Sequence, residues 1–493
     1  MKTCVIIGGG IGGLVSGALL AKEGYKVTVL EKNAIIGGGL QTFKRRGVSF
    51  PTGMHIFGGF QEGGNLRKLF EYLGVMDKIS LRPTDDDASD VVTMMDDGKT
   101  YNLPQGKERF VAYLSVMFPA EKEAIKAYID RLFELSEEED LFYLRENNGE
   151  VPQFSEDFVR PFDELIDRYI TDPKLKTLLG YLSPLFGGEE GTTPAYLNAL
   201  PNVLHRGGTF QFVGGSQQLA DALEIVIENA GGQVIANEEV VKIAVENRQV
   251  LGVFTKNGKC YQAECYISDV HPDVLLRIID EGAFPTAFKN RVSEIPETVS
   301  SFKVFVKFKE GAFPYLNHAH FLHAQQESTW PRELMFVTPP QENQGDFAQT
   351  MVIISSMEFG QVMRWENTRT GHRGEAYESW KQAMTDKVLG RMKQLYPDFC
   401  DKIDFVFAAS PLTIRDFYGN KEGSNYGFQK DSRNLILSQM SVTTKVKNLF
   451  LTGQNVNIHG LCGVSLTAIE TAEALVGRNA IVGKINNFWI NHS

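Results

Sequence analysis

The chain has 493 residues, about three times the ~150 residues of an average domain, so two or three domains with sizeable cores are expected. Hydrophobic residues make up 43% and charged residues 23%, which is ordinary for a globular protein and excludes a disordered chain and a bundle of membrane spans. The net charge of −11, from 50 Lys and Arg against 61 Asp and Glu, would repel a phosphate backbone, so we expect no nucleic-acid partner.

The cysteines and the apolar runs indicate the compartment. The five cysteines are scattered and include no CxxC pair, which favours a reducing, cytoplasmic environment. The apolar run over residues 4–21 resembles a leader or an anchor, but six glycines interrupt it and charged residues follow. No other window approaches the ~18 uncharged apolar residues that a spanning helix needs. We therefore expect a cytoplasmic protein that associates with a membrane, if at all, only at the membrane surface.

The first predicted elements are a strand, a helix and a second strand. Residues 3–8 are rich in β-branched side chains and end in a glycine, which is typical of a buried parallel strand. Residues 14–23 carry apolar side chains at helical spacing, and residues 26–31 predict the next strand. This order is that of a βαβ unit.

Three glycines at the first strand–helix junction, Gly8, Gly10 and Gly13, form a GxGxxG pattern. Gly8 permits the tight turn, Gly10 lets the main chain approach a pyrophosphate, and Gly13 lets the helix pack closely on the strand. Free N–H groups at the helix N-terminus favour phosphate. Glu31 follows at the end of the second strand, where a carboxylate accepts ribose hydroxyls and repels a 2′-phosphate. The pattern predicts an unphosphorylated adenosine, as in NAD or FAD.

A second glycine turn favours FAD over NAD. Gly37, Gly38 and Gly39, followed by Leu40, come soon after the acidic residue and would let the main chain run along the longer cofactor. No second GxGxxG unit with its own strand, helix and acid is present, so stable NAD(P)H binding is not indicated. The electron donor or acceptor stays open between a quinone, oxygen, a ferredoxin-like protein and a transient nicotinamide.

Two further ordered blocks return to the first unit. One runs from a glycine turn at 207–215 through a helix at 217–230 and several strands up to residue 268. The other, residues 447–475, is a short strand, a glycine and a helix. The stretches between the blocks are rich in Phe, Tyr, Leu and Met and predict a cap built from two insertions.

These blocks predict an α/β protein with two domains. A Rossmann-like FAD-binding domain is assembled from residues 1–85, 205–275 and 405–493. An α+β substrate-binding cap takes residues 86–204 and 276–404.

At these motifs the chain resembles the FAD-dependent phytoene desaturases, carotenoid isomerases and retinol saturases of the amine oxidase-like flavoprotein superfamily. It looks closest to the retinol saturase branch. The resemblance is carried by residues 8–38, by FPTGMHIFGG at 50–59, by GGTFQFVGGSQQLADAL at 207–223, and by SPLTIRDFYG at 410–419 with NLFLTGQNVNIHGLCG at 448–463. It implies a flavin enzyme acting on a polyene.

The resemblance also implies further cofactor contacts. Val240 or Val241 would meet the adenine through main-chain groups, and residues 453–455 would lie along the ribityl and phosphate groups. Asn455 stands where the superfamily usually has Asp, which exchanges a carboxylate for an amide. The expected cofactor-binding set is Gly8, Gly10, Gly12, Gly13, Glu31, Lys32, Gly38, Gly39, Leu40, Gly53, His55, Val240, Val241, Gly453, Gln454, Asn455, Gly463 and Val464.

Two histidines are the candidate catalytic residues. His55 lies in the stretch that resembles the flavin-facing segment of the saturases, and it could exchange a proton near the ring or order a turn. His459 lies in the last cofactor stretch and could contact the flavin or shape the loop. The HxHxxH run from His318 to His323 would place its third histidine on the opposite strand face, so we expect no metal.

Three functions remain open. The leading hypothesis is hydride exchange between flavin N5 and a double bond of an isoprenoid polyene or similar apolar molecule. The rivals are a flavin oxidase of amines or of a porphyrinogen-like ring, and a non-catalytic flavin- or lipid-binding protein. An amphipathic helix over 65–76 could be a membrane-dipping lip or could simply face the core.

Overall fold

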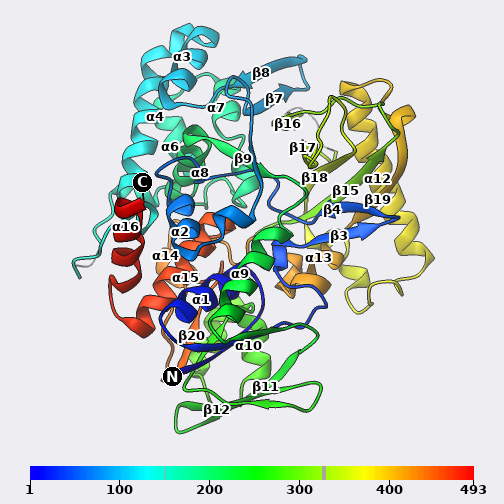
Figure 1. Ribbon diagram of the computed structural model, residues 1–493. Helices are drawn as coiled ribbons and strands as arrows, with labels where there is room; N and C mark the ends of the chain where they lie inside the picture. The colour runs from blue at the N-terminus through cyan, green and yellow to red at the C-terminus, as the bar shows by residue number, and fades with distance from the viewer. Residues whose placement is uncertain (150–151, 325–328, 493) are drawn as a thin grey trace.

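The computed structural model describes residues 1–149, 152–324 and 329–492. Its first layer is a five-stranded sheet whose neighbouring strands all run parallel. In order across the sheet the strands are β10 (Gln233–Ile235), β2 (Lys26–Leu30), β1 (Thr3–Ile7), β14 (Cys265–Ser268) and β20 (Leu449–Leu451). In Figure 1 the blue, green and orange-red parts of the chain meet at the end of the molecule where the N-terminus lies.

Both faces of this sheet are covered, which explains why its strands read as continuous apolar runs. On one face α1 (Ile11–Lys22) packs against both α9 (Gln217–Asn229) and α15 (Gly460–Val476). The other face is covered by an antiparallel sheet of β11 (Val240–Glu246), β12 (Gln249–Thr255) and β13 (Cys260–Tyr261). The predicted Rossmann-like α/β fold class is confirmed.

The second half is built on a seven-stranded mixed sheet. Its order is β19 (Ile403–Ala409), β15 (Ser300–Phe308), β18 (Thr350–Met357), β17 (Glu333–Val337), β16 (Ala319–His323), β7 (Asp90–Met94) and β8 (Lys99–Leu103). Strand residues alternate between two faces. Phe302, Val304 and Val306 face the long helix α12 (Glu375–Leu395) through Val388 and Met392. Part of the opposite face lines a cavity, through Lys303, Phe321 and Met335.

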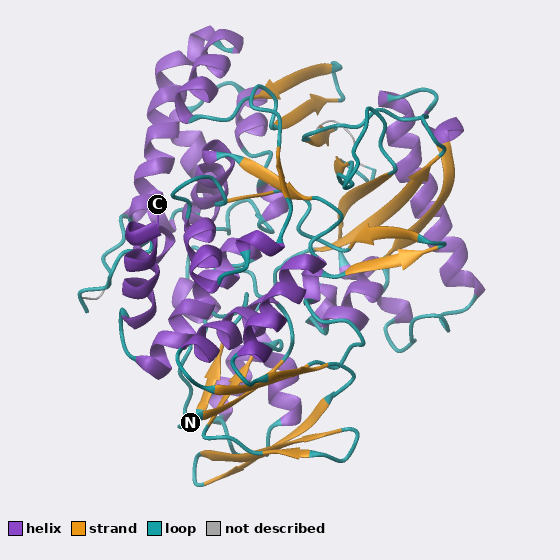
Figure 2. Ribbon diagram, in the orientation of Figure 1, coloured by secondary structure: helices purple, strands orange, loops and turns teal. Residues whose placement is uncertain are grey.

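Helices flank this sheet on one side, as Figure 2 shows. They are α3 (Lys107–Met117), α4 (Lys122–Glu137), α5 (Glu156–Val159), α6 (Phe162–Tyr169), α7 (Pro173–Leu179) and α8 (Ala195–Gly207). A buried charge cluster ties β7 to α8, because the Asp90 carboxylate accepts hydrogen bonds from Tyr181 at 2.8 Å, His205 at 2.9 Å and Arg206 at 3.1 Å. These partners hold the pKa of the Asp90 carboxyl below its usual range against the opposing effect of burial.

Two small sheets join the halves. The hairpin of β3 (Thr42–Arg45) and β4 (Val48–Pro51) sets Phe50 against Phe305 and Phe407 of the seven-stranded sheet, with ring centroids 5.9 and 5.1 Å apart. A second antiparallel sheet has the order β5, β9, β6. The remaining elements are β5 (Phe57–Gly58), β6 (Leu81–Pro83), β9 (Thr209–Phe212), α2 (Asn65–Leu73), α10 (Pro272–Ile278), α11 (Thr286–Glu294), α13 (Pro411–Tyr418), α14 (Leu435–Ser438) and α16 (Ala480–His492).

The two large sheets draw their strands from different predicted domain segments. Every strand of the parallel sheet comes from one of the three predicted cofactor segments, and β7, β8 and β15 to β18 come from the two predicted insertions. Strand β19 runs across the predicted boundary between residues 404 and 405. The β3–β4 hairpin belongs to the first cofactor segment but packs on the cap sheet. The domain boundaries themselves stay a prediction.

The helix over 65–76 ends earlier than expected, at Leu73, and it faces the core. Leu66, Leu69, Phe70 and Leu73 are all buried, and the helix packs against α16. The membrane-lip interpretation of this helix is therefore wrong. Among the described residues no single helix is long and apolar enough to cross a bilayer; α15 and α16 together have the length and composition, but their axes are bent by 116°.

The burial of α2 predicts a specific stability difference. Leu69→Ala should lower the free energy of unfolding by about 2–5 kcal/mol, because it leaves a cavity in the core. Ile436→Ala is the matched control, since that side chain is 82% exposed and its truncation should change stability by less than ~0.5 kcal/mol. Urea unfolding of both variants measures this. Equal midpoints would contradict the core position of Leu69.

Candidate functional site

A cavity of about 450 Å³ begins at the carboxyl edge of the parallel sheet and extends into the cap. Gly8 follows β1, Glu31 follows β2, Asp269 follows β14 and Gly453 follows the short loop after β20, and all four line the cavity. The carboxyl ends of parallel strands meet at one edge, which is where open α/β sheets bind their ligands. The fold therefore gathers the predicted motifs at one end of this cavity.

Glu31 is held in place by main-chain amides. Its Oε2 accepts from Gly9 N at 2.9 Å and its Oε1 from Asn33 N at 2.7 Å, and the side chain is 6% exposed. Each carboxylate oxygen keeps further acceptor capacity toward the cavity. Lys32 also lines the cavity, with its Nζ donating to the Asp416 carbonyl oxygen at 3.3 Å. This corner suits the hydroxyls of a ribose.

The glycine turns approach each other so closely that side chains would not fit. A Cβ atom on Gly38 would lie 3.3 Å from the α-carbon of Gly10. One on Gly12 would lie 3.1 Å from the α-carbon of Gly453, and one on Gly53 would lie 2.9 Å from a carbonyl oxygen of the second glycine turn. The three turns form a cradle of main-chain groups that is longer than one nucleotide turn needs. These residues fit the diphosphate and ribityl chain of FAD.

Most of the expected cofactor residues line this cavity, and two do not. Gly13 lies inside α1, where a Cβ would overlap the Gly8 carbonyl oxygen, so its role is the close packing of helix and strand. Val241 is 44% exposed and lies outside the lining, whereas Val240 belongs to it. The lining residues from the expected set are Gly8, Gly10, Gly12, Glu31, Lys32, Gly38, Gly39, Leu40, Gly53, His55, Val240, Gly453, Gln454, Asn455, Gly463 and Val464.

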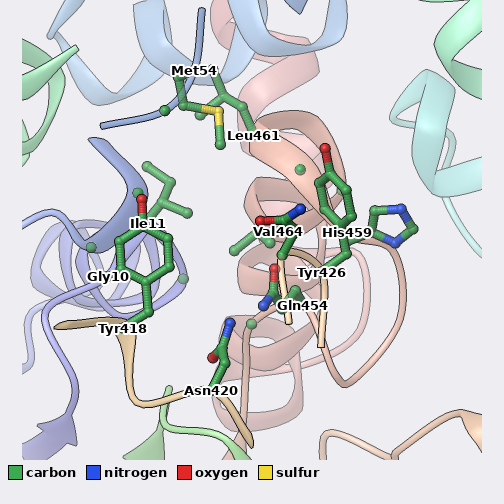
Figure 3. A pocket seen from close by; sticks show the side chains of 18 of the residues that line it. Gly10, Ile11, Met54, Tyr418, Asn420, Tyr426, Gln454, His459, Leu461 and Val464 are labelled. Atoms are coloured by element: carbon green, nitrogen blue, oxygen red, sulfur yellow. The ribbon is translucent and has the colours of Figure 1, made fainter. Parts of the chain in front are cut away.

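Asn455 uses its amide on a neighbouring loop. Its Oδ1 accepts from Phe428 N at 2.8 Å, and the side chain is 6% exposed. This loop also carries Tyr426, which faces Tyr418 across the open space in Figure 3. The amide in place of the superfamily's usual carboxylate therefore fixes one wall of the cavity.

Beyond the cradle the cavity is apolar. Met54 and Leu461 lie together at one end of the view in Figure 3. Apolar side chains from α8 and from the inner face of the cap sheet continue the wall, among them Leu197, Leu200, Leu204, Phe321, Met335 and Ile354. The chamber has the character of a binding site for a largely hydrocarbon molecule.

His55 lies in the cavity wall without a partner. Both ring nitrogens are buried and neither has a hydrogen-bond partner among the described residues. Burial, helped by the positive charge of Lys303, lowers the pKa of His55 to about 3. The imidazole is therefore neutral at pH 7, and it can offer one acceptor nitrogen and one N–H donor to a bound molecule. A catalytic role for His55 stays a prediction.

Lys303 is a functional candidate that sequence reasoning missed. It projects from β15, its Nζ donates to the Thr52 carbonyl oxygen at 2.8 Å, and burial lowers its pKa to about 8. Lys303 alternates along the strand with Phe302 and Val304. The same alternation is expected for a strand at the edge of a sheet whose lysine faces solvent. Only the packing of the opposite sheet face shows that this lysine faces the cavity.

His459 lines the cavity beside a second buried lysine. Burial and the charge of Lys430 lower the pKa of His459 to about 3, and burial lowers the pKa of Lys430 to about 7. The ring centroids of His459 and Tyr426 are 4.8 Å apart, and Figure 3 shows the two side chains next to each other. Lys430 Nζ donates to the Ser438 carbonyl oxygen at 2.9 Å. A chemical role for His459 also stays a prediction.

The HxHxxH run takes ordinary partners. His320 and Thr93 Oγ1 lie 2.9 Å apart, while His323 Nδ1 lies 3.3 Å from Glu333 Oε1 on the neighbouring strand. The described residues contain no group of three or more side chains placed to hold a metal ion. Glu333 was not foreseen as a partner, because cross-strand register is not visible in the sequence.

A dinucleotide cradle at the edge of a covered parallel sheet, opening into an apolar chamber, defines an FAD-dependent oxidoreductase. The chain belongs to the family described as flavin containing amine oxidoreductase, whose model matches residues 11–476. The resemblance seen in the motifs is thereby confirmed, and FAD is the cofactor.

Named relatives cover almost the whole chain. It is 23% identical to all-trans-retinol 13,14-reductase of Danio rerio, over 96% of this chain and 86% of that protein. It is 24% identical to prolycopene isomerase 2 of an Oncidium hybrid cultivar, over 92% of this chain and 79% of that one. Among solved structures, an oxidoreductase from Methanosarcina mazei matches with a TM-score of 0.68 at 18% identity, covering 96% of this chain and all of that one, 100%. The last match shows the fold alone.

The corner around Glu31 predicts how FAD affinity responds to substitution. Glu31→Gln should weaken FAD binding about tenfold or more, because a carboxamide accepts fewer hydrogen bonds than a carboxylate. Glu239→Gln is the control, since Glu239 lines the same cavity but pairs with Lys256 at 3.1 Å and its side chain is 44% exposed. Quenching of flavin fluorescence gives the Kd. An unchanged Kd for Glu31→Gln would contradict this assignment.

Proposed function

We propose that the protein exchanges hydride between FAD and a carbon–carbon double bond of an apolar polyene, as a saturase, desaturase or isomerase. The observation that carries this proposal is the continuity of the cavity, which runs from the glycine cradle into a chamber walled by Met54, Leu461 and the inner face of the cap sheet. The names of the relatives, a retinol reductase and a prolycopene isomerase, support the same substrate class.

The chain's own residues have a limited set of tasks. Bound FAD supplies the hydride exchange at its N5 position. The apolar walls exclude water and align an extended molecule. When protonated, Lys303 places a positive charge in the wall, which favours negative charge that develops beside it. Because burial keeps His55 neutral at pH 7, its imidazole has one ring nitrogen that accepts and one N–H that donates a hydrogen bond to a bound molecule.

An anaerobic experiment with both redox states of the flavin tests the reaction. The FAD-loaded protein, one sample oxidised and one reduced with dithionite, is mixed with all-trans-retinol, with prolycopene or with an amine. With at least one polyene we expect bleaching of the oxidised flavin, recovery of the visible absorbance of the reduced flavin, or a changed double-bond pattern in the product by mass spectrometry and NMR. An unreacted flavin and an unchanged polyene in every case would overturn the proposal.

Oxygen consumption separates the rival functions. A flavin oxidase of amines or of a porphyrinogen-like ring would release peroxide with its substrate, and an oxygen electrode records this directly. A non-catalytic carrier would bind polyenes tightly without any change of the flavin spectrum.

The chamber wall predicts a variant that separates substrate binding from cofactor binding. Leu461→Trp should fill part of the chamber and reduce polyene turnover at least about tenfold, because the larger side chain takes space that the substrate needs; a tenfold loss corresponds to about 1.4 kcal/mol. FAD affinity should stay within about twofold, since Leu461 lies beyond the cradle. Leu461→Met conserves the volume and is the control. Loss of FAD from Leu461→Trp, or full turnover by it, would contradict this placement.

A further inference from the structure

Asp269 turns its side chain into the glycine cradle. It directly follows β14, and its Oδ2 accepts a hydrogen bond from Gly13 N at 2.8 Å. A Cβ atom on Gly453 would lie 2.5 Å from Oδ1, and one on Gly12 would be closer still. The carboxylate therefore stands among the main-chain groups that form the cradle. The Gly13 amide that donates to this carboxylate lies at the N-terminus of a helix, and such amides often bind phosphate groups.

The surroundings of Asp269 offer it no ion-pair partner among the described residues. In the part of the chain that the structure describes, no lysine, arginine or histidine forms an ion pair with Asp269. The glycine turn and residues 452–455 carry no ionisable side chain, and the end of β2 contributes Glu31, which is acidic. On its own segment, His271 pairs instead with Glu297, because its Nε2 lies within hydrogen-bond distance of Glu297 Oε2 at 3.3 Å.

The surroundings favour the neutral acid. Burial, with a further contribution from the Glu31 charge, raises the pKa of Asp269 to about 7, although the hydrogen bond from Gly13 acts in the opposite direction. A diphosphate bound in the same cradle would add negative charge beside this carboxylate. Like charges at that separation raise a carboxyl pKa further.

We propose that Asp269 is a cofactor-binding residue that holds FAD as the neutral carboxylic acid, so that FAD binding takes up one proton from solution. Oδ2 keeps the hydrogen bond from Gly13 N, and the proton resides on Oδ1, the oxygen nearest Gly12 and Gly453. In this form Oδ1 donates a hydrogen bond to a diphosphate oxygen that a carboxylate would repel. The inference concerns the cofactor alone and does not depend on which substrate the enzyme uses.

The sign of the pH dependence follows from linkage. Below the pKa of about 7, Asp269 in the free protein already carries the proton, so FAD affinity is constant there. Above that pKa the proton must be taken up with FAD, and the Kd rises toward tenfold per pH unit. Between pH 7 and pH 9 we expect the Kd to rise by about 50-fold, because half of the free protein is already ionised at pH 7.

Titration calorimetry of the apoprotein with FAD counts the protons. At pH 8 the binding enthalpy is measured in phosphate and in Tris, whose ionisation enthalpies differ, and the difference gives the protons taken up per FAD. We expect about one proton at pH 8 and close to none at pH 5.5, from the linkage relation. A proton count near zero at pH 8 would overturn the proposal, with no variant needed.

A variant then identifies the residue, because Lys303 and Lys430 also titrate near this range. Asp269→Asn has the shape and the donor of the neutral acid. It should bind FAD at pH 8.5 about 10- to 30-fold more tightly than the natural chain and with no proton uptake. Glu239→Gln removes a carboxylate from the same cavity and should keep the natural pH profile. A pH profile unchanged by Asp269→Asn would show that another group takes up the proton.

Discussion

The close approach of main chains at the carboxyl edge of the parallel sheet is the constraint on which the rest of this structure depends. A Cβ atom on Gly12 would lie only 3.1 Å from the α-carbon of Gly453, and one on Gly38 only 3.3 Å from the α-carbon of Gly10. Segments far apart in the sequence must therefore meet at that edge. The long insertions between them form the cap, and the site lies where the two parts join.

The cap uses the two faces of one sheet for different purposes. On β15, Phe302 and Val304 face α12 and make a dense core, while Lys303 between them faces the cavity. The sheet face that packs on α12 stabilises the cap, and the face toward the cavity carries Lys303 and the apolar lining. A buried amine costs free energy, and its lowered pKa is the sign of that cost.

The local pattern was sufficient to predict the cofactor unit. Strand, glycine turn, helix and Glu31 are close in sequence, and each has a direct physical role, so their position in the structure follows the expectation. The motifs also located the later cofactor segments, but Val241 shows the limit, because which of two adjacent strand residues faces a cavity depends on the register.

The residues that sequence reasoning missed depend on packing at a distance. Asp269 could have been found from its place after a parallel strand, since carboxyl ends of such strands meet at the ligand. Lys303 and the pairing of His323 with Glu333 could not, because they follow from cross-strand register and from which face the helices cover. The apolar stripe of α2 would look the same in a helix that contacts lipid and in one that packs on the core. Only the contact with α16 shows that this helix packs on the core.

The β3–β4 hairpin makes the two halves mechanically dependent on each other. It comes from the cofactor half, yet Phe43 and Phe50 interlock with Phe305 and Phe407 on the cap sheet. A hinge motion that swung the halves apart would have to separate these ring pairs, each worth about 0.5–1.5 kcal/mol. An exchange of substrate that required the halves to separate would therefore have to break these ring pairs first.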